Sequence, residues 1–127
     1  MHQIKSNYEV YKQSISSYME IMAVVKADAY GHGDIIVAKF LSDYGVRHFA
    51  VSNIDKAIHI RNAGAVGQIL FLGYTPVERT IDLIDYDVTQ ALLSEEDAEV
   101  IKRTGLPKNV SSQLILVCDV LGSMLII

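Results

Sequence analysis

The 127-residue sequence lacks several features that would assign it to particular classes of protein. Its single cysteine, Cys118, excludes an internal disulfide and fits a reducing compartment. The 11 basic and 15 acidic residues are interspersed, for a formal charge of −4, and no basic cluster marks a nucleic-acid surface. No apolar run approaches the ~20 residues that span a bilayer, and the polar first residues do not form a secretory signal. We therefore expect a soluble, cytoplasmic protein that binds neither nucleic acid nor membrane.

Three further absences limit the fold and the ligands. No Gly-x-Gly-x-x-Gly follows an apolar run, which weakens a dinucleotide-binding interpretation. The histidine and acidic residues do not have the spacing of a metal site, so we expect no metal. There is no linker or low-complexity segment, and 50% of the residues are hydrophobic. The chain is therefore expected to be one domain, or part of one, with a substantial core.

Apolar runs alternate with helical patterns along most of the chain. Strands are predicted over 21–26, 46–51, 69–72, 88–92 and 114–118, and helices over 2–18, 34–44, 54–62, about 76–85 and 94 to about 104. Ser52, Thr75 and Ser94 are the predicted helix caps. Strands that begin every ~20–25 residues and alternate with helices are typical of a parallel α/β sheet. The rhythm alone leaves open a (β/α)8 barrel and a doubly wound sheet.

A lysine ends the first apolar run. Residues 21–25 are all apolar, and Lys26 follows them directly. In an α/β protein, ligands bind at the carboxyl ends of the strands. Apolar neighbours disfavour the charged form of an amine, which makes Lys26 a candidate for covalent chemistry with a carbonyl group.

The loop after Lys26 could bind an anion. The Tyr30 phenol can reach an anionic group of the same ligand, and the helix that opens at Asp34 points free N–H groups toward it. Gly31 and Gly33 are expected to supply positive φ. Each of these residues has a more ordinary role when taken alone, and only their conjunction indicates a site. Pyridoxal phosphate (PLP) has both an aldehyde and a phosphate, the two groups that such a site would bind.

Residues 23–33 read Ala-Val-Val-Lys-Ala-Asp-Ala-Tyr-Gly-His-Gly, which resembles the PLP-binding signature of alanine racemases. The resemblance implies that Lys26 binds PLP covalently and that Tyr30 lies beside the cofactor phosphate. A second match, Gln-Ile-Leu-Phe-Leu-Gly at 68–73, implies that Leu72 forms part of the pocket wall. Alanine racemases carry PLP in a (β/α)8 TIM-type barrel followed by a β-domain. The chain is thus expected to be an incomplete amino-terminal barrel domain of about five strands with intervening helices.

The resemblance also implies a reaction, the interconversion of L-alanine and D-alanine for cell-wall precursor supply. The partners would be a small amino-acid substrate and a second copy of the protein, in a homodimer with shared active sites. Inversion at Cα needs a base on each face, and the resemblance assigns one face to Lys26. The other base is a tyrosine of a partner subunit's carboxy-terminal domain, outside these 127 residues. We therefore expect this chain to be an inactive fragment.

Alternative interpretations remain open on the sequence. One is a racemase of the same fold that acts on serine or another amino acid. Another is a non-catalytic PLP-binding protein, although that group lacks the Ala-Tyr-Gly-His-Gly continuation. A PLP-dependent barrel decarboxylase needs different surroundings for its lysine, and an inert racemase remnant would share every motif.

The resemblance extends over about residues 3–113 and is lost in the apolar segment 114–127. The family's strand at this point ends in a motif like Ile-Asp-Thr-Gly-Met-x-Arg-x-Gly. Codons that encode residues 113–127 can be chosen so that a second reading frame exists. This frame begins at the third base of codon 113 and encodes Ile-Asp-Thr-Gly-Met-Arg-Arg-Phe-Gly. We therefore expect 114–127 to be an out-of-frame tail that is poorly specified in structure.

Overall fold

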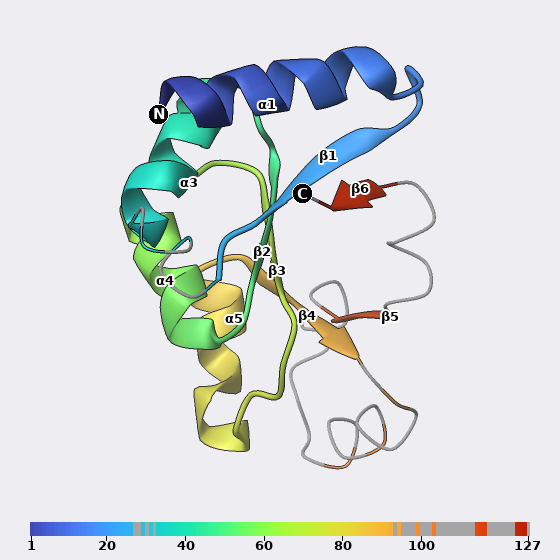
Figure 1. Ribbon diagram of the computed structural model, residues 1–127. Coiled ribbons are helices and arrows are strands. Elements are labelled where there is room, and N and C mark those ends of the chain that lie inside the picture. Colours follow the sequence, from blue (N-terminus) through green and yellow to red (C-terminus); the bar gives the residue numbers. More distant parts are fainter. Residues whose placement is uncertain are drawn as a thin grey trace.

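The computed structural model describes residues 1–26, 29, 31, 33–92, 94, 99, 103, 114–116 and 124–126. Its elements are α1 (His2–Ser14), β1 (Glu20–Val24), α3 (Asp34–Asp43), β2 (His48–Val51), α4 (Ile54–Asn62), β3 (Gln68–Phe71), the 3-10 helix η1 (Val77–Arg79), α5 (Thr80–Asp85), β4 (Val88–Leu92), β5 (Leu114–Leu116) and β6 (Met124–Ile126) (Figure 1). Helices and strands alternate as predicted as far as β4. Most of the helix predicted from 94 lies outside the described residues.

The strands form one parallel sheet of six, in the order β5-β4-β3-β2-β1-β6. From β1 to β4 each strand lies beside its successor in the chain. The strand predicted at 114–118 is present as β5, next to β4. The sequence does not predict β6, which pairs with β1 at the opposite edge. The segment 114–127 therefore contributes two short strands, and its remaining residues lie outside the described part of the chain.

The two faces of the sheet have different coverings. Figure 1 shows α3, α4 and α5 together on one side of the strands. The strand side chains in the cluster with these helices are Ile21, Ala23, Val25, Phe49, Val51, Ile69, Phe71 and Val88. A second cluster on the other face contains Met22, Ala50, Leu70 and Ala91. A doubly wound sheet carries helices on both faces, so one-sided covering of the described sheet favours an arc of a barrel.

The first helix is shorter than its apolar pattern predicts. It ends at Ser14 instead of Tyr18, because Ile15 is extended, with φ −90° and ψ 154°. The backbone N–H of Met19 then donates to the Ser16 carbonyl at 2.9 Å, in a turn that leads into β1. Tyr8 is the buried residue of α1 and packs with the helix-side core.

Two of the predicted helix caps are wrong. Asn53 rather than Ser52 caps α4, and its Oδ1 accepts from the Lys56 backbone N–H at 2.8 Å. A cap must precede the N–H it binds by about three positions, and Ser52 comes one residue too early. Thr75 is buried, but its hydroxyl has no hydrogen-bond partner among the described residues. The segment after Pro76 begins as the 3-10 helix η1 instead, and the Arg79 N–H donates to the Pro76 carbonyl at 2.9 Å.

A glycine lets β3 start close against the preceding strand. Gly67 has φ +95°, and a Cβ at this position would lie 2.2 Å from the Arg47 carbonyl oxygen. That carbonyl accepts from the Gln68 N–H at 2.8 Å, next to the first residue pair of the β2–β3 ladder. Any other residue here would displace the backbone contact that sets this register.

Candidate functional site

Lys26 lies at the carboxyl edge of the sheet, two residues beyond β1, and it is exposed. The ladder continues almost to this point, because the Val25 N–H donates to the Ala50 carbonyl at 2.8 Å. By strand alternation, Lys26 faces the same side as Met22 and Val24, away from the helices. The apolar run before Lys26 predicts that all of its members surround the amine. Ile21 and Val25 instead pack in the helix-side core and do not flank it. Only alternate members of an apolar strand can line one face of a site.

Lys26 and Leu72 belong to one row of the sheet. Val24 pairs with Ala50, and Ala50 pairs with Leu70. Two residues further along each strand, the same register aligns Lys26, Ser52 and Leu72 on the face away from the helices. Leu72 is 39% exposed, and its N–H donates to the Val51 carbonyl at 3.0 Å. Since β2 lies between them, the backbones of Lys26 and Leu72 are about 10 Å apart.

The described residues between Lys26 and α3 have left-handed backbone conformations. Gly31 and Gly33 have φ values of 85° and 81°, as the sequence predicts. Ala29 also has positive φ, 50°, and is buried, which the sequence does not predict. Tyr30, the predicted phosphate ligand, lies outside the described residues.

The helices that begin at this edge are tied to each other by their first turns. Lys56 of α4 forms an ion pair with Asp34, the first residue of α3. The preceding residue, Asp55, accepts from Arg79 Nη1 at 2.6 Å. Arg79 Nε also donates to Asp82 of α5 at 2.9 Å, and these two hydrogen bonds raise the pKa of the Arg79 guanidinium. Adjacent residues of α4 thus contact the helices on either side of it.

Sequence reasoning missed this set of ion pairs. It identified Asp34 only as the start of a helix. The available signal was position, because each residue falls in the first turn of a helix that follows a strand. Parallel strands bring those first turns to the same edge.

Two surface cavities do not include Lys26 or Leu72, although Val24, Val25 and Ala29 beside the lysine line one of them. One, of about 390 Å³, lies between α1 and the sheet and is lined by Ile4, Tyr8, Tyr11, Val25 and Leu41 among others. The other, of about 300 Å³, lies at the amino ends of β1 and β2. Neither Lys26 nor Leu72 lines either cavity. Within the described part of the chain, no group of three or more His, Cys, Asp or Glu residues is placed to hold a metal ion.

None of the helices described in this structure has both the length and the apolar character needed to cross a bilayer.

Comparison with known proteins identifies relatives for most of the chain. The family described as alanine racemase, N-terminal domain, matches residues 1–122. Alanine racemase 1 of Caldanaerobacter subterraneus subsp. tengcongensis is 34% identical over 116 residues, which cover 91% of this chain and 30% of that protein. The solved alanine racemase of Clostridium difficile 630 has a TM-score of 0.74 and 34% identity, over 88% of this chain and 29% of its own. A histidine racemase from Leuconostoc mesenteroides has a TM-score of 0.68 and 27% identity, over 80% and 27%.

The parallel sheet and the helices on one of its faces define part of a (β/α)8 barrel, and Lys26 lies at the carboxyl edge of this sheet. Within that class, the chain belongs to the alanine racemase family, through its N-terminal domain. It spans about 30% of the length of the first curated relative it matches. The family match ends at residue 122, somewhat beyond the point where the sequence motifs are lost.

Proposed function

We propose that this chain carries the PLP-binding lysine of an alanine racemase. The observation that supports the proposal is the position of Lys26, an exposed primary amine at the carboxyl edge of a parallel sheet. The described residues fit the aldehyde end of PLP, because Lys26 provides an amine and Leu72 provides a partly exposed apolar side chain on the same face. Tyr30 is the proposed ligand of the phosphate end.

The proposed roles follow the chemistry of each side chain. When bound, PLP withdraws electron density from the substrate Cα, so that the Cα proton becomes acidic. Lys26 Nζ would hold the cofactor, and once the substrate amine has taken its place, the freed Lys26 amine would accept or return the Cα proton on one face. Leu72 would exclude water from the apolar side of the bound cofactor. The second face requires another base, which we assign to a tyrosine of a second subunit in a homodimer.

The proposed substrate is alanine, and the proposed location is the cytoplasm. Most of the relatives reported above are named alanine racemases, whereas one structural relative is a histidine racemase. A racemase for another amino acid is therefore the second candidate, because the same barrel accommodates a different substrate in that relative. The part of the pocket that surrounds the substrate side chain decides between them. Comparing alanine, serine and histidine as substrates of the full-length protein would separate the two.

The test of the proposed function is chemical labelling of the chain with PLP. Borohydride reduction makes the lysine–PLP linkage permanent, and mass spectrometry of the digested chain then identifies the labelled peptide. We expect the label on Lys26, and its loss in Lys26→Ala and Lys26→Arg. The matched control is Lys39→Ala, which removes an exposed lysine of α3 and should leave the label in place. A label on Lys12, Lys39 or Lys56 instead would contradict the proposal.

A further inference from the structure

Gly73 comes directly after Leu72, just beyond the end of β3, and its surroundings are crowded. A Cβ at this position would lie 2.6 Å and 2.8 Å from Cε2 and Cζ of the Phe71 ring, and 3.3 Å from the Ser52 carbonyl oxygen. Cβ atoms essentially never come closer than 3.0 Å to such neighbours, so an alanine here would force something to move. Gly73 is not among the glycines with positive φ. Close packing, rather than backbone conformation, therefore explains the glycine.

The neighbours of Gly73 cannot easily give way to a side chain. Phe71 is 2% exposed, and its ring belongs to the helix-side core, where dense packing leaves little room to move. The Ser52 oxygen belongs to the backbone directly after β2. The carbonyl before it, that of Val51, accepts from the Leu72 N–H at 3.0 Å. A side chain at position 73 would therefore displace the end of β3 itself.

Leu72 lies between Phe71 and Gly73 and depends on both. Strand alternation directs positions 71 and 73 toward the helices and Leu72 toward the opposite face. Three neighbouring strands change from buried to exposed at the same row, at the residue pairs Val25–Lys26, Val51–Ser52 and Phe71–Leu72. Because Leu72 is already exposed, contacts of its own side chain do not fix it. The backbone on either side sets its direction instead.

We infer that Gly73 is a positioning residue that holds Leu72 on the face of Lys26, an inference that rests on the proposed function. The missing Cβ lets the end of β3 lie against Phe71 and keeps the Leu72 N–H on the Val51 carbonyl. Leu72 is then placed to contact the apolar side of a cofactor held by Lys26. A side chain at position 73 displaces Leu72, and it weakens PLP binding although it does not touch the cofactor.

The test is a double-mutant cycle on PLP binding. Dissociation constants are obtained by titration, from the visible absorbance of the lysine-bound ligand, for the unaltered chain, Gly73→Ala, Leu72→Ala and the double variant. We expect each single variant to weaken binding about fivefold to tenfold, because each removes the same apolar contact. The double variant should bind within about twofold of Leu72→Ala, since Gly73 then has no side chain left to position. Effects that multiply in the double variant, or an unchanged constant in Gly73→Ala, would overturn the inference.

A compensating variant tests the cause of the displacement. Leucine ends at its δ carbons and lacks the two ring atoms that lie nearest to position 73. We therefore expect Phe71→Leu/Gly73→Ala to bind PLP within about twofold of Phe71→Leu alone. The matched control is Gly64→Ala, whose Cβ would meet nothing within 4 Å but whose φ of +93° strains an alanine. It should lower stability and leave the PLP constant unchanged.

Circular dichroism establishes folding for each variant. Equal weakening of PLP binding in Gly64→Ala and Gly73→Ala would overturn the inference, because general loss of stability would then explain both. If Gly73→Ala does not fold, the Phe71→Leu pair decides, and a loss above about fivefold when alanine is added to Phe71→Leu would overturn the inference. Failure of the proposed function is distinguishable, because the unaltered chain would then carry no PLP label on Lys26.

Discussion

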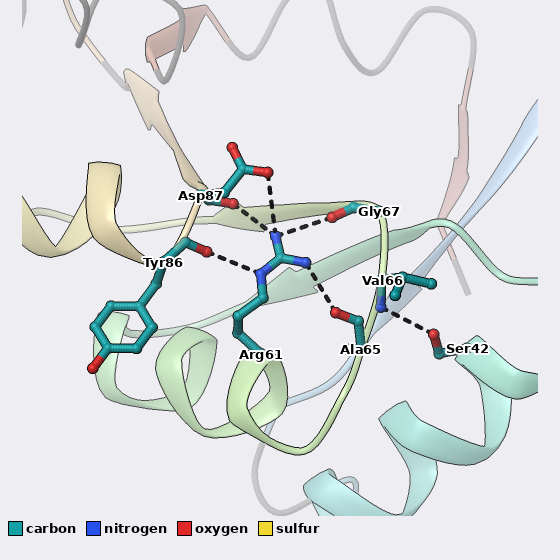
Figure 2. Close-up of polar contacts among 7 residues, drawn as sticks. All are labelled: Ser42, Arg61, Ala65, Val66, Gly67, Tyr86 and Asp87. Carbon is teal, nitrogen blue, oxygen red and sulfur yellow. Dashed lines mark hydrogen bonds and ion pairs between the residues drawn. The ribbon is translucent and has the colours of Figure 1, made fainter.

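Arg61 Nη2 donates to the backbone carbonyl of Asp87 at 2.7 Å, across 26 positions of sequence. The same guanidinium also donates to the carbonyls of Tyr86, Ala65 and Gly67 at 2.9, 2.9 and 3.0 Å (Figure 2). One side chain at the end of α4 thus binds both the loop before β3 and the turn before β4. Burial lowers the pKa of this guanidinium, and the Asp87 carboxylate, 3.8 Å away, partly offsets that effect.

Replacement of Arg61 should therefore destabilise the fold. Arg61→Lys keeps a charge but cannot present five donors in a planar fork, and we expect it to lower the free energy of unfolding by about 1–3 kcal/mol. The estimate is modest because two of the four hydrogen bonds are exposed and water can replace them. Urea denaturation followed by circular dichroism measures the change. Arg103→Lys is the matched control, since the Arg103 side chain is 81% exposed, and an equal loss there would refute the special role of Arg61.

The sequence predicts the elements better than their connections. The α4 bounds at 54–62 and the β4 bounds at 88–92 agree with the structure, because turn residues flank both segments. The alignment of Lys26 with Leu72 follows once the strands are parallel and consecutive. The ion pairs between helices could not be predicted from the sequence. The spacing of apolar residues indicates which face of a helix is buried, but it does not indicate which charged residues of two neighbouring helices meet.

A single-residue offset explains the wrong cap of α4. Ser52 and Asn53 are both good caps, and only the helix start distinguishes them. The strand β6 has only three residues, which is too short for an apolar pattern to identify it as a strand. Tyr30 stays a prediction from the family resemblance.

Acid should remove the stability that Asp34 contributes. The pKa of its carboxyl is lowered in the folded chain, so this stability is complete above the unfolded pKa, about 3.9, and is lost as pH falls through the folded value. We expect Asp34→Asn to unfold about 1–3 kcal/mol more easily at pH 7, with the difference shrinking in acid. Thermal unfolding between about pH 7 and pH 2 measures this, because the loss develops below the unfolded pKa of about 3.9. Asp43→Asn, at an exposed pair, should show a difference near zero, and a pH-independent effect of Asp34→Asn would contradict the assignment.

The 127-residue chain alone should not racemise alanine at a rate above that of free PLP. Its six described strands are fewer than the eight of a closed barrel, and the proposed second base comes from another region of the protein. An assay of D-alanine formed from L-alanine, with Lys26→Ala as the control, measures the rate. Sustained turnover that disappears in Lys26→Ala would show that this expectation is wrong.

The last prediction concerns the gene around codon 113. The family's motif after this position is absent from residues 114–127, but a frame shifted to the third base of codon 113 can encode Ile-Asp-Thr-Gly-Met-Arg-Arg-Phe-Gly. We therefore propose that 114–127 is read out of frame. DNA sequencing should find the motif in the shifted frame, followed by the remaining barrel strands and a β-domain. If the shifted frame instead meets a stop codon or encodes no such strands, the frameshift proposal is wrong and the tail belongs to this protein's own sequence.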